Sequence, residues 1–357
     1  MKKIKPNFRS KPKPQHVAVV GAGMAGIACA RTLMQAGHQV TVFESEAAIG
    51  GRMATQASAF GTFDPGVQYF TVRDPRFVRA LETVPDLCKR WSANAVHMLD
   101  ATGHIADSVL PPQEPHWVAT PGMNALASRW ALPLMSAHNV ELETRVTHLE
   151  RDALNSQQWQ LRTEGLQASQ QVFSGFDAVL LAIPAEPARL LLNTAQQADK
   201  FGQQLDMVKM APCWTLMVAF PQAMQPGLTT LGPQWNAARS NHHRIAWLAR
   251  ESSKPGRSAV ERWTVQASPA WSQEHLGDDP SRVQAKLLKG FSEITGIRAV
   301  PAHVETVRWP YAQTTVPLGR SHLWDPATNL GVCGDWCLGH RVEDAFVSGL
   351  ELALSVA

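Results

Sequence analysis

The sequence predicts an α/β fold in which a parallel-sheet unit is built from both ends of the chain and a mixed α+β unit is inserted between them. Three observations support this prediction. An apolar strand, a glycine-rich turn and an amphipathic helix open the chain after residue 16. Tryptophan-rich, strand-like segments without regular βα alternation fill the middle. A strand, a Gly-Asp turn and a helix close the chain over residues 330–354.

The opening segment has the pattern of a complete βαβ unit. Residues 17–20 are all apolar and predict a short buried strand. The turn at 21–26 reads Gly-Ala-Gly-Met-Ala-Gly, and helical periodicity then runs to about residue 36. Gly37 stands where a helix C-cap belongs, and residues 39–43 predict the second strand, which leads into Glu44.

The turn has the residues that a dinucleotide pyrophosphate requires. Gly21 permits the tight turn that leaves the strand, Gly23 lets the backbone approach the phosphates, and Gly26 lets the helix pack on the strand. The amides of Met24 and Ala25, at the helix N-terminus, can bind the phosphates. The motif predicts an ADP-containing cofactor, but alone it does not separate NAD from FAD.

Glu44 lies 18 residues after Gly26, at the end of the second strand. A carboxylate there can accept hydrogen bonds from both ribose hydroxyls and would repel a 2′-phosphate, which argues against NADP. Ser45 follows directly and is a further candidate for the cofactor site.

Two further segments favour FAD. Gly50, Gly51 and Arg52 follow the ribose acid closely, and they offer a second backbone approach with a cation for the second phosphate of a longer dinucleotide. Gly334 and Asp335 end a late strand, and Asp335 could hydrogen-bond ribityl or ribose hydroxyls or could cap a turn.

A helix is expected to open at Val342 and Glu343. Its N-terminus would stabilise negative charge on the pyrimidine edge of a reduced flavin.

The middle of the chain predicts the remaining elements. Residues 140–149 and 159–163 predict two antiparallel strands, residues 176–183 predict a buried strand, and a short helix passes through 190–192. Residues 205–220 and 244–266 are strand-like, and 280–294 predict an amphipathic helix. The expected division is a basic leader at 1–15, nucleotide-domain segments at 16–80, 121–195 and 313–357, and substrate-domain segments at 81–120 and 196–312.

Composition excludes several classes of protein. The net charge of +3 comes from the first 16 residues. The body of the chain therefore lacks the excess of basic residues that is typical of a nucleic-acid-binding protein. No apolar run is long enough to span a membrane. The five cysteines have no metal-ligand spacing, and reduced thiols in a cytoplasmic protein are expected, with a redox pair of Cys333 and Cys337 as the alternative.

These segments together resemble the FAD-dependent amine oxidase-like superfamily, with its glutathione-reductase-type FAD-binding Rossmann domain. The match covers the glycines at 21, 23, 26, 50, 51 and 334, together with Glu44, Arg52 and Asp335. The resemblance implies non-covalent FAD. It also implies that the backbone of Val146 meets the adenine, and that residues 182–184 end a strand near the cofactor.

Four segments resemble the renalases more closely, particularly the bacterial ones. They are residues 63–71 with 74–77, residues 121–123, residues 247–250 running into 252–257, and residues 308–312. The sequence departs from the pattern at Pro65, where a histidine is expected. The resemblance implies oxidation of isomeric dihydro-NAD(P) by hydride transfer to flavin N5, with O2 accepting the electrons and H2O2 forming.

Hydride transfer to a flavin requires alignment and charge stabilisation rather than a protein nucleophile. Candidate substrate residues are Gln68, Tyr69, Trp247 and Tyr311, and the two tyrosines could form an aromatic wall, with ordinary core packing as the alternative.

Four further residues have two interpretations. His242 and His243 could bind substrate polar groups, although surface histidines are favoured. Lys254 and Arg257 could meet substrate phosphates or be solvated charges on a turn at Pro255.

Two other functions stay open. One is oxidation of amines or other carbon-hydride donors on the same fold. The other is a flavin-free binding protein, of which the GDP-dissociation inhibitors are an example. The Gly50–Arg52 and Gly334–Asp335 elements argue against the second, because a protein without flavin has no physical need for them.

Overall fold

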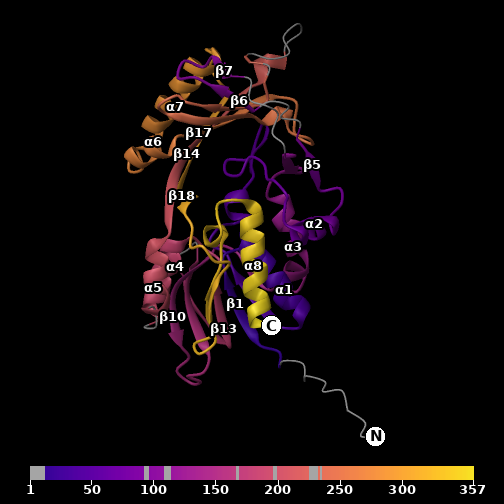
Figure 1. The fold of residues 1–357 in the computed structure, drawn as a ribbon, viewed down its shortest axis with the longest axis vertical. Helices are drawn as coiled ribbons and strands as arrows, with labels where there is room; N and C mark the ends of the chain where they lie inside the picture. Colours follow the sequence, from indigo (N-terminus) through magenta and orange to yellow (C-terminus); the bar gives the residue numbers. More distant parts are fainter. Residues whose placement is uncertain are drawn as a thin grey trace.

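The structure is a computed structural model, and it describes residues 13–91, 96–107, 114–165, 169–195, 199–224, 232–233 and 235–357. Most of the expected basic leader lies outside these residues. Figure 1 shows two parts along the long axis, with the longest strand of the chain running between them. The lower part contains the first and the last helix, and the upper part contains a second sheet with helices packed beside it.

The lower part is organised around a six-stranded, largely parallel sheet. Its order is β19-β20-β13-β1-β2-β9, and only β19 runs antiparallel to its neighbour. The strands are β1 (His16–Val20), β2 (Gln39–Phe43), β9 (Val140–Glu141), β13 (Ala178–Leu181), β19 (Leu323–Asp325) and β20 (Leu330–Val332). Strands from both ends of the chain thus meet in one sheet.

Alternate residues of β1 face two different cores, because successive side chains of a strand point to opposite faces. Val17 and Val19 pack with the helices α1 (Met24–Ala36), α3 (Ala125–Ser136) and α8 (Val342–Val356). Ala18 and Val20 pack with the helices α4 (Ala185–Thr194) and α5 (Asp199–Met207) and with a three-stranded sheet. That sheet consists of β10 (Thr144–Arg151), β11 (Trp159–Gly165) and β12 (Gln170–Phe176).

The upper part is a seven-stranded sheet in the order β18-β14-β17-β16-β15-β6-β7. Its strands are β6 (Val96–Leu99), β7 (Ile105–Asp107), β14 (Lys209–Phe220), β15 (Ala237–Ser240), β16 (Ile245–Arg250), β17 (Glu261–Ala267) and β18 (His303–Val316). Helix α7 (Pro280–Thr295) packs its apolar face on the sheet, and α6 (Pro269–Glu274) lies nearby, as Figure 1 shows.

Short elements complete the structure. They are the helix α2 (Pro75–Glu82), the strands β3 (Gln56–Ser58), β4 (Gly61–Phe63), β5 (Cys88–Arg90) and β8 (Trp117–Ala119), and the single turns η1 (Gly51–Met53), η2 (Pro221–Met224), η3 (Glu251–Ser253) and η4 (Asp335–Cys337).

The predicted α/β fold class and the opening βαβ unit are confirmed, including Gly37 as a left-handed C-cap. Three predicted elements differ. Residues 140–149 form two strands, because Glu143 adopts φ 54° and β9 joins the six-stranded sheet. Residues 176–183 divide into the end of β12 and a separate β13. Residues 205–207 belong to α5, so the long strand begins only at Lys209.

The division into domains stays a prediction. Strand β18 runs across the boundary expected at residue 312. Among the described residues, no helix has both the length and the apolar character needed to cross a membrane.

Candidate active site

The first glycine turn is held by close backbone contacts. Gly21 adopts φ 103°, and a Cβ there would lie 2.6 Å from the carbonyl oxygen of Ala182 on the neighbouring strand. A Cβ at Gly26 would clash with the carbonyl oxygen of Gly21. Gly23 has nothing within 4 Å of its Cβ position, so this side of the turn is open to a ligand.

The second glycine loop stacks on the first. The amide of Gly50 donates to the carbonyl of Ala22 at 3.1 Å, and a Cβ at Gly51 would lie 3.3 Å from Cα of Gly23. No side chain caps α1, because Gly23 is its N-cap. The first-turn amides of the helix have no intrahelical acceptor and remain available to an anion.

Glu44 is buried at the end of β2, with 7% of its surface exposed. Its Oε2 accepts from the amide of Ala22 at 2.7 Å, and its Oε1 accepts from the amide of Glu46 at 3.0 Å and from the Ser45 hydroxyl at 3.3 Å. The carboxylate is therefore fixed beside the N-terminus of α1, where Oε2 keeps a further lone pair for a ligand hydroxyl.

Strand β10 is tied to the backbone of Glu44. The amide of Thr144 donates to the carbonyl oxygen of Glu44 at 2.8 Å. Val146 pairs with Thr163 of β11, and the register shifts directly after this pair, so that Thr147 is left out of the ladder. The irregularity therefore lies next to Val146 and not at it.

Arg52 and Asp335 bind each other. The Arg52 guanidinium makes a two-point ion pair with the Asp335 carboxylate, including an Nη1–Oδ2 hydrogen bond of 2.9 Å, and it also donates to the carbonyl of Ala312. The pair joins the second glycine loop to η4. Both residues were predicted for the cofactor site from the sequence, but the ion pair between them was not.

Helix α8 opens at Val342 as predicted. The carboxylate of Glu343 accepts from the amides of Arg73 (2.5 Å) and Asp74 (2.8 Å), so this side chain holds the loop before α2. Only the backbone of the first helical turn is then left to face a cofactor.

An aromatic cluster forms around Tyr69. Its ring centroid lies 3.9 Å from that of His116, 5.8 Å from that of Trp247 and 6.4 Å from that of Trp91. Tyr69 and Trp247 were expected from the sequence. His116 was missed, because it belongs to no motif and a bridge between Phe70 and Trp117, two segments distant in the sequence, brings it there.

Among the described residues, no direct ring contact joins Tyr69 to Tyr311. Two rings that flank a substrate need not touch each other, so the aromatic wall of the two tyrosines stays a prediction. Burial and the neighbouring carboxylate of Glu186, on α4, raise the pKa of Tyr311.

The pKa of His116 is lowered, first by burial and then by the positive charge of Arg239. The imidazole is therefore neutral near pH 7.

Gln68 belongs to a buried polar network rather than to an open surface. Its Nε2 donates to the carbonyls of Asp64 and Gly66, and its Oε1 accepts from Lys254 Nζ at 3.2 Å. Lys254 also donates to Asp64 Oδ2 at 3.1 Å and to Glu251 Oε1 at 3.0 Å.

Lys254 and Arg257 correct the sequence interpretation. Both side chains are fully buried, and Arg257 Nη2 lies 2.8 Å from Asp64 Oδ2. They are neither solvated turn charges nor surface groups open to a phosphate. The partner of both cations, Asp64, lies about 190 residues earlier in the sequence. No local sequence pattern connects Asp64 to Lys254 or Arg257, so the pairing could not be predicted.

The two acids of this cluster respond differently to burial. Burial raises the pKa of the Asp64 carboxyl, but Lys254 and Arg257 outweigh burial and hold it below its ordinary value. Burial raises the pKa of Glu251 despite the nearby Lys254, and Oε2 of Glu251 has no hydrogen-bond partner among the described residues.

The expectation that His242 and His243 are both surface residues was wrong for His242. His243 is exposed, but His242 is buried at 6% exposure, and its Nε2 lies 3.2 Å from Glu293 Oε2. All five cysteines are free thiols, in agreement with the reduced state expected, and the Cys333 and Cys337 side chains are buried.

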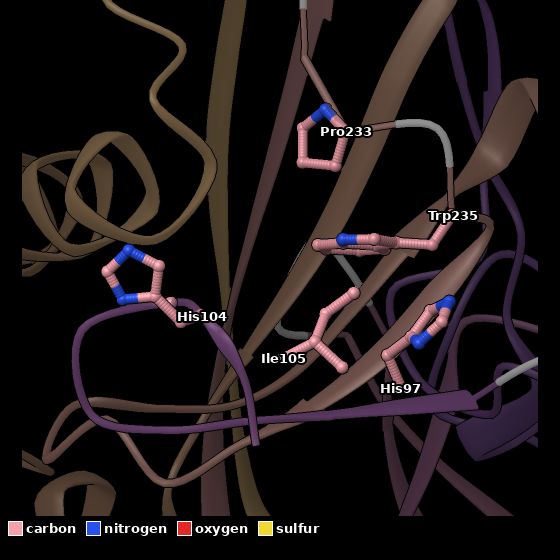
Figure 2. A pocket seen from close by; sticks show the side chains of 6 residues that line it. His97, His104, Ile105, Pro233 and Trp235 are labelled. Atoms are coloured by element: carbon pink, nitrogen blue, oxygen red, sulfur yellow. The ribbon is translucent and has the colours of Figure 1, made fainter. Parts of the chain in front are cut away.

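A surface hollow lies elsewhere on the upper sheet, around β6 and the turn into β7. Figure 2 shows the side chains of His97, His104, Ile105, Pro233 and Trp235 around it. None of the residues expected for the active site lines this hollow.

The residues of the lower part fit an FAD molecule. The open side of Gly23 and the uncapped N-terminus of α1 suit a pyrophosphate, and the fixed carboxylate of Glu44 suits a ribose. The stacked second loop at Gly51 extends the same backbone surface, as a cofactor longer than a mononucleotide requires.

Comparison with known proteins agrees with this arrangement. The profile of an NAD(P)-binding Rossmann-like domain matches residues 19–83, and that of the flavin-containing amine oxidoreductases matches residues 106–356. An L-amino acid oxidase of Lachesis muta is 49% identical over 51 residues, which are 14% of this chain and 10% of that protein. An L-amino-acid oxidase of Mus musculus is 56% identical over 43 residues, 12% of this chain and 7% of that protein. The matched segment thus spans about a tenth or less of these relatives.

Two solved structures share the fold over nearly the whole chain. A candidate protoporphyrinogen oxidase from Exiguobacterium sp. 255-15 superposes with a TM-score of 0.73 at 14% identity, covering 96% of this chain and 99% of that one. Cyclohexylamine oxidase from Brevibacterium oxydans gives 0.69 at 13% identity, with the same coverage. Because the family profile covers more than half of the chain, this protein belongs to the flavin-containing amine oxidoreductase family.

Proposed function

We propose that this protein is a renalase-like oxidase that takes a hydride from isomeric dihydro-NAD(P) and passes the electrons to O2 with formation of H2O2. The observation that carries the proposal is the cluster of tilted rings formed by Tyr69, His116 and Trp247. The cluster follows directly on the loop at Gly66, which packs against Arg52. A flat nicotinamide ring can lie against such a cluster.

We assign the cofactor contacts as follows. The backbone at Gly21, Gly23 and Gly26, with the amides of Met24 and Ala25, would hold the pyrophosphate, and Glu44, with Ser45 beside it, would hold the adenosine ribose. The backbone of Val146 would meet the adenine. The remaining contacts would come from Gly51, Arg52, Gly334, Asp335 and the α8 N-terminus at Val342 and Glu343.

When bound, FAD supplies the hydride acceptor at N5. The chain itself supplies orientation and exclusion of water. Trp247 and Tyr69 would keep the donor ring flat, and Gln68 would fix the loop beneath it through Lys254. The neutral His116 can donate or accept one hydrogen bond to a polar substituent of the ring.

Oxidation of an amine is the second candidate, because the family name and the cyclohexylamine oxidase fold point to it. Aromatic rings such as Tyr69 and Trp247 can also flank an ammonium group. The charge around the cluster favours the first candidate, since the Arg239 field that lowers the pKa of His116 also repels a protonated amine.

The test begins with the visible spectrum of the purified protein, which should show bound flavin. The protein is then mixed without oxygen with 2- and 6-dihydro-NAD(P), with ordinary NADH and with simple amines. We expect the dihydro isomers to bleach the flavin, and admission of air to restore it with one H2O2 per turnover. If only amines bleach the flavin, the renalase-like assignment is wrong.

We also propose a reducing, cytoplasmic location, on the ground that all five cysteines are free thiols.

A further inference from the structure

Four side chains form one row across the seven-stranded sheet. Arg239 pairs with Trp247, Trp247 pairs with Gln266, and Gln266 pairs with Thr215. Residues directly opposite each other in antiparallel strands point to the same face. The row therefore lies on one face, crossing from β14 to β15.

The inner end of the row binds the loop that precedes Tyr69. Thr215 Oγ1 donates to the carbonyl of Pro65 at 2.9 Å, and Gln266 Nε2 donates to the carbonyl of Gly66 at 2.6 Å. The next amide, that of Val67, donates to the carbonyl of Arg52 at 2.9 Å. This face of the sheet therefore looks toward the second glycine loop of the cofactor site.

Trp247, in the middle of the row, holds an unused donor. The side chain is 9% exposed, and its buried Nε1 has no hydrogen-bond partner among the described residues. A buried N–H without an acceptor is unfavourable, so a ligand oxygen placed there would be favourable. The neighbouring rings of Tyr69 and His116 make the surroundings flat and apolar.

Arg239, at the outer end, holds an unused charge. The side chain is exposed, and within the described part of the chain it makes no hydrogen bond or ion pair. Its field nevertheless reaches His116, since it contributes to the lowered pKa of that imidazole. The nearest carboxylate acting on His116, that of Glu114, is already paired with Arg73.

We propose that Arg239 binds a phosphate of the substrate. The flat nicotinamide ring of the same substrate then lies against Tyr69 and Trp247, and the carbonyl oxygen on that ring accepts a hydrogen bond from Trp247 Nε1. Adjacent strands lie about 4.8 Å apart. A ring over Trp247 can therefore carry a phosphate arm that reaches the next strand. This subsite deepens the proposed function by assigning the residues that bind the phosphate and the ring of the substrate, and it rests on that function for the identity of the ring only.

The test measures binding without turnover in the FAD-loaded protein. The probes are nicotinamide mononucleotide and nicotinamide riboside, which differ by one phosphate and cannot donate a hydride. Perturbation of the flavin spectrum and quenching of tryptophan fluorescence report the dissociation constants. We expect Arg239→Gln to weaken mononucleotide binding by about tenfold or more and riboside binding by less than about twofold, since hydrogen bonds to charged groups are the stronger ones.

Three other variants complete the test. Arg239→Lys should restore part of the mononucleotide affinity. Trp247→Phe keeps a ring but removes the donor, so it should weaken both probes alike. Arg298→Gln removes an exposed arginine away from the row and serves as the control with unchanged binding.

The outcomes separate the subsite from the reaction. Equal mononucleotide affinity in the wild type and Arg239→Gln would overturn the subsite, even if the dihydro isomers bleach the flavin. Arg239-dependent mononucleotide binding without bleaching by any dihydronicotinamide would leave the subsite standing and refute the proposed reaction. Arg239 is exposed, and an unchanged flavin spectrum of its variants checks that they fold.

Discussion

At the scale of single residues, Glu44 shows how one side chain can organise a cofactor site before any cofactor binds. Its two carboxylate oxygens accept from Ala22, in the first glycine turn, and from Glu46, in the loop after β2. The same residue receives the amide of Thr144 on its carbonyl oxygen. Three segments that are distant in the sequence are thus fixed around one buried acid.

Replacing Glu44 with arginine should therefore weaken FAD retention strongly. The change removes the acceptor and places a cation beside the amides of the first turn, so we expect the FAD affinity to fall by at least about 10- to 100-fold. Ultrafiltration with flavin fluorescence measures the released FAD. Glu46→Arg adds the same charge at the exposed neighbouring position and should retain FAD. Unchanged affinity in the Glu44 variant would refute the ribose role.

At the scale of secondary structure, the first and last helices are held together by a glycine. A Cβ at Gly349 of α8 would clash with the carbonyl oxygen of Ala25 at the start of α1. Figure 1 shows the two helices side by side in the lower part. The contact fixes α1 at the end where its free amides lie, so packing and cofactor binding depend on the same position.

Gly349→Ala should be destabilising although alanine is the better helix former. The added methyl group must push α8 away from α1, which costs about 1–3 kcal/mol, and FAD retention should fall with it. Gly202→Ala is the matched control, because Gly202 lies within α5 with nothing within 4 Å of its Cβ position. That variant should gain up to about 1 kcal/mol from helix propensity. Urea unfolding of both variants measures the difference, and equal effects would contradict the contact.

At the scale of the whole molecule, a buried cluster of charges joins the two parts. Asp64 lies on the loop next to the cofactor site, whereas Glu251, Lys254 and Arg257 follow β16 of the upper sheet. Thr264, on β17, donates to Glu251 at 2.7 Å. The cluster therefore fixes the upper sheet relative to the cofactor loop through hydrogen bonds rather than through apolar packing alone.

Glu251→Gln should change how stability depends on pH. Burial raises the folded-state pKa of Glu251. The contribution of Glu251 to the free energy of unfolding is therefore fully present below its ordinary pKa, and it is lost as the pH rises through the folded-state pKa. The slope is at most about 1.4 kcal/mol per pH unit for one proton. Glutamine cannot titrate, so the variant should lack this loss.

Asp64 contributes with the opposite sign and serves as the internal control. The folded-state pKa of Asp64 lies below its ordinary pKa. Its contribution to the free energy of unfolding is therefore present above the ordinary pKa, and it is lost as the pH falls through the folded-state pKa. The Glu251→Gln variant should keep this acid limb. Urea unfolding from about pH 3 to pH 8 measures both limbs. Parallel curves for the variant and the wild type would contradict the raised pKa of Glu251.

Local patterns were enough to predict the ADP side of the fold. The turn at residues 21–26, Glu44 and the start of α8 lie where the sequence places them. These features depend on backbone conformations that only glycine permits, on helix ends and on apolar periodicity, all of which act within a few residues. The break at Glu143 was missed, since a non-glycine residue with positive φ leaves little signal in a sequence.

The sequence by itself determined that this chain builds a dinucleotide site, because each requirement of that site is met by consecutive residues. Only the tertiary structure decided the partners of its charges and the composition of the aromatic cluster. Arg52 meets Asp335 across 283 positions, and Lys254 meets Asp64 across 190. His116 and Arg239 come to Tyr69 and Trp247 through backbone pairing. Such contacts arise from the register between distant strands, and no spacing within one segment can specify it.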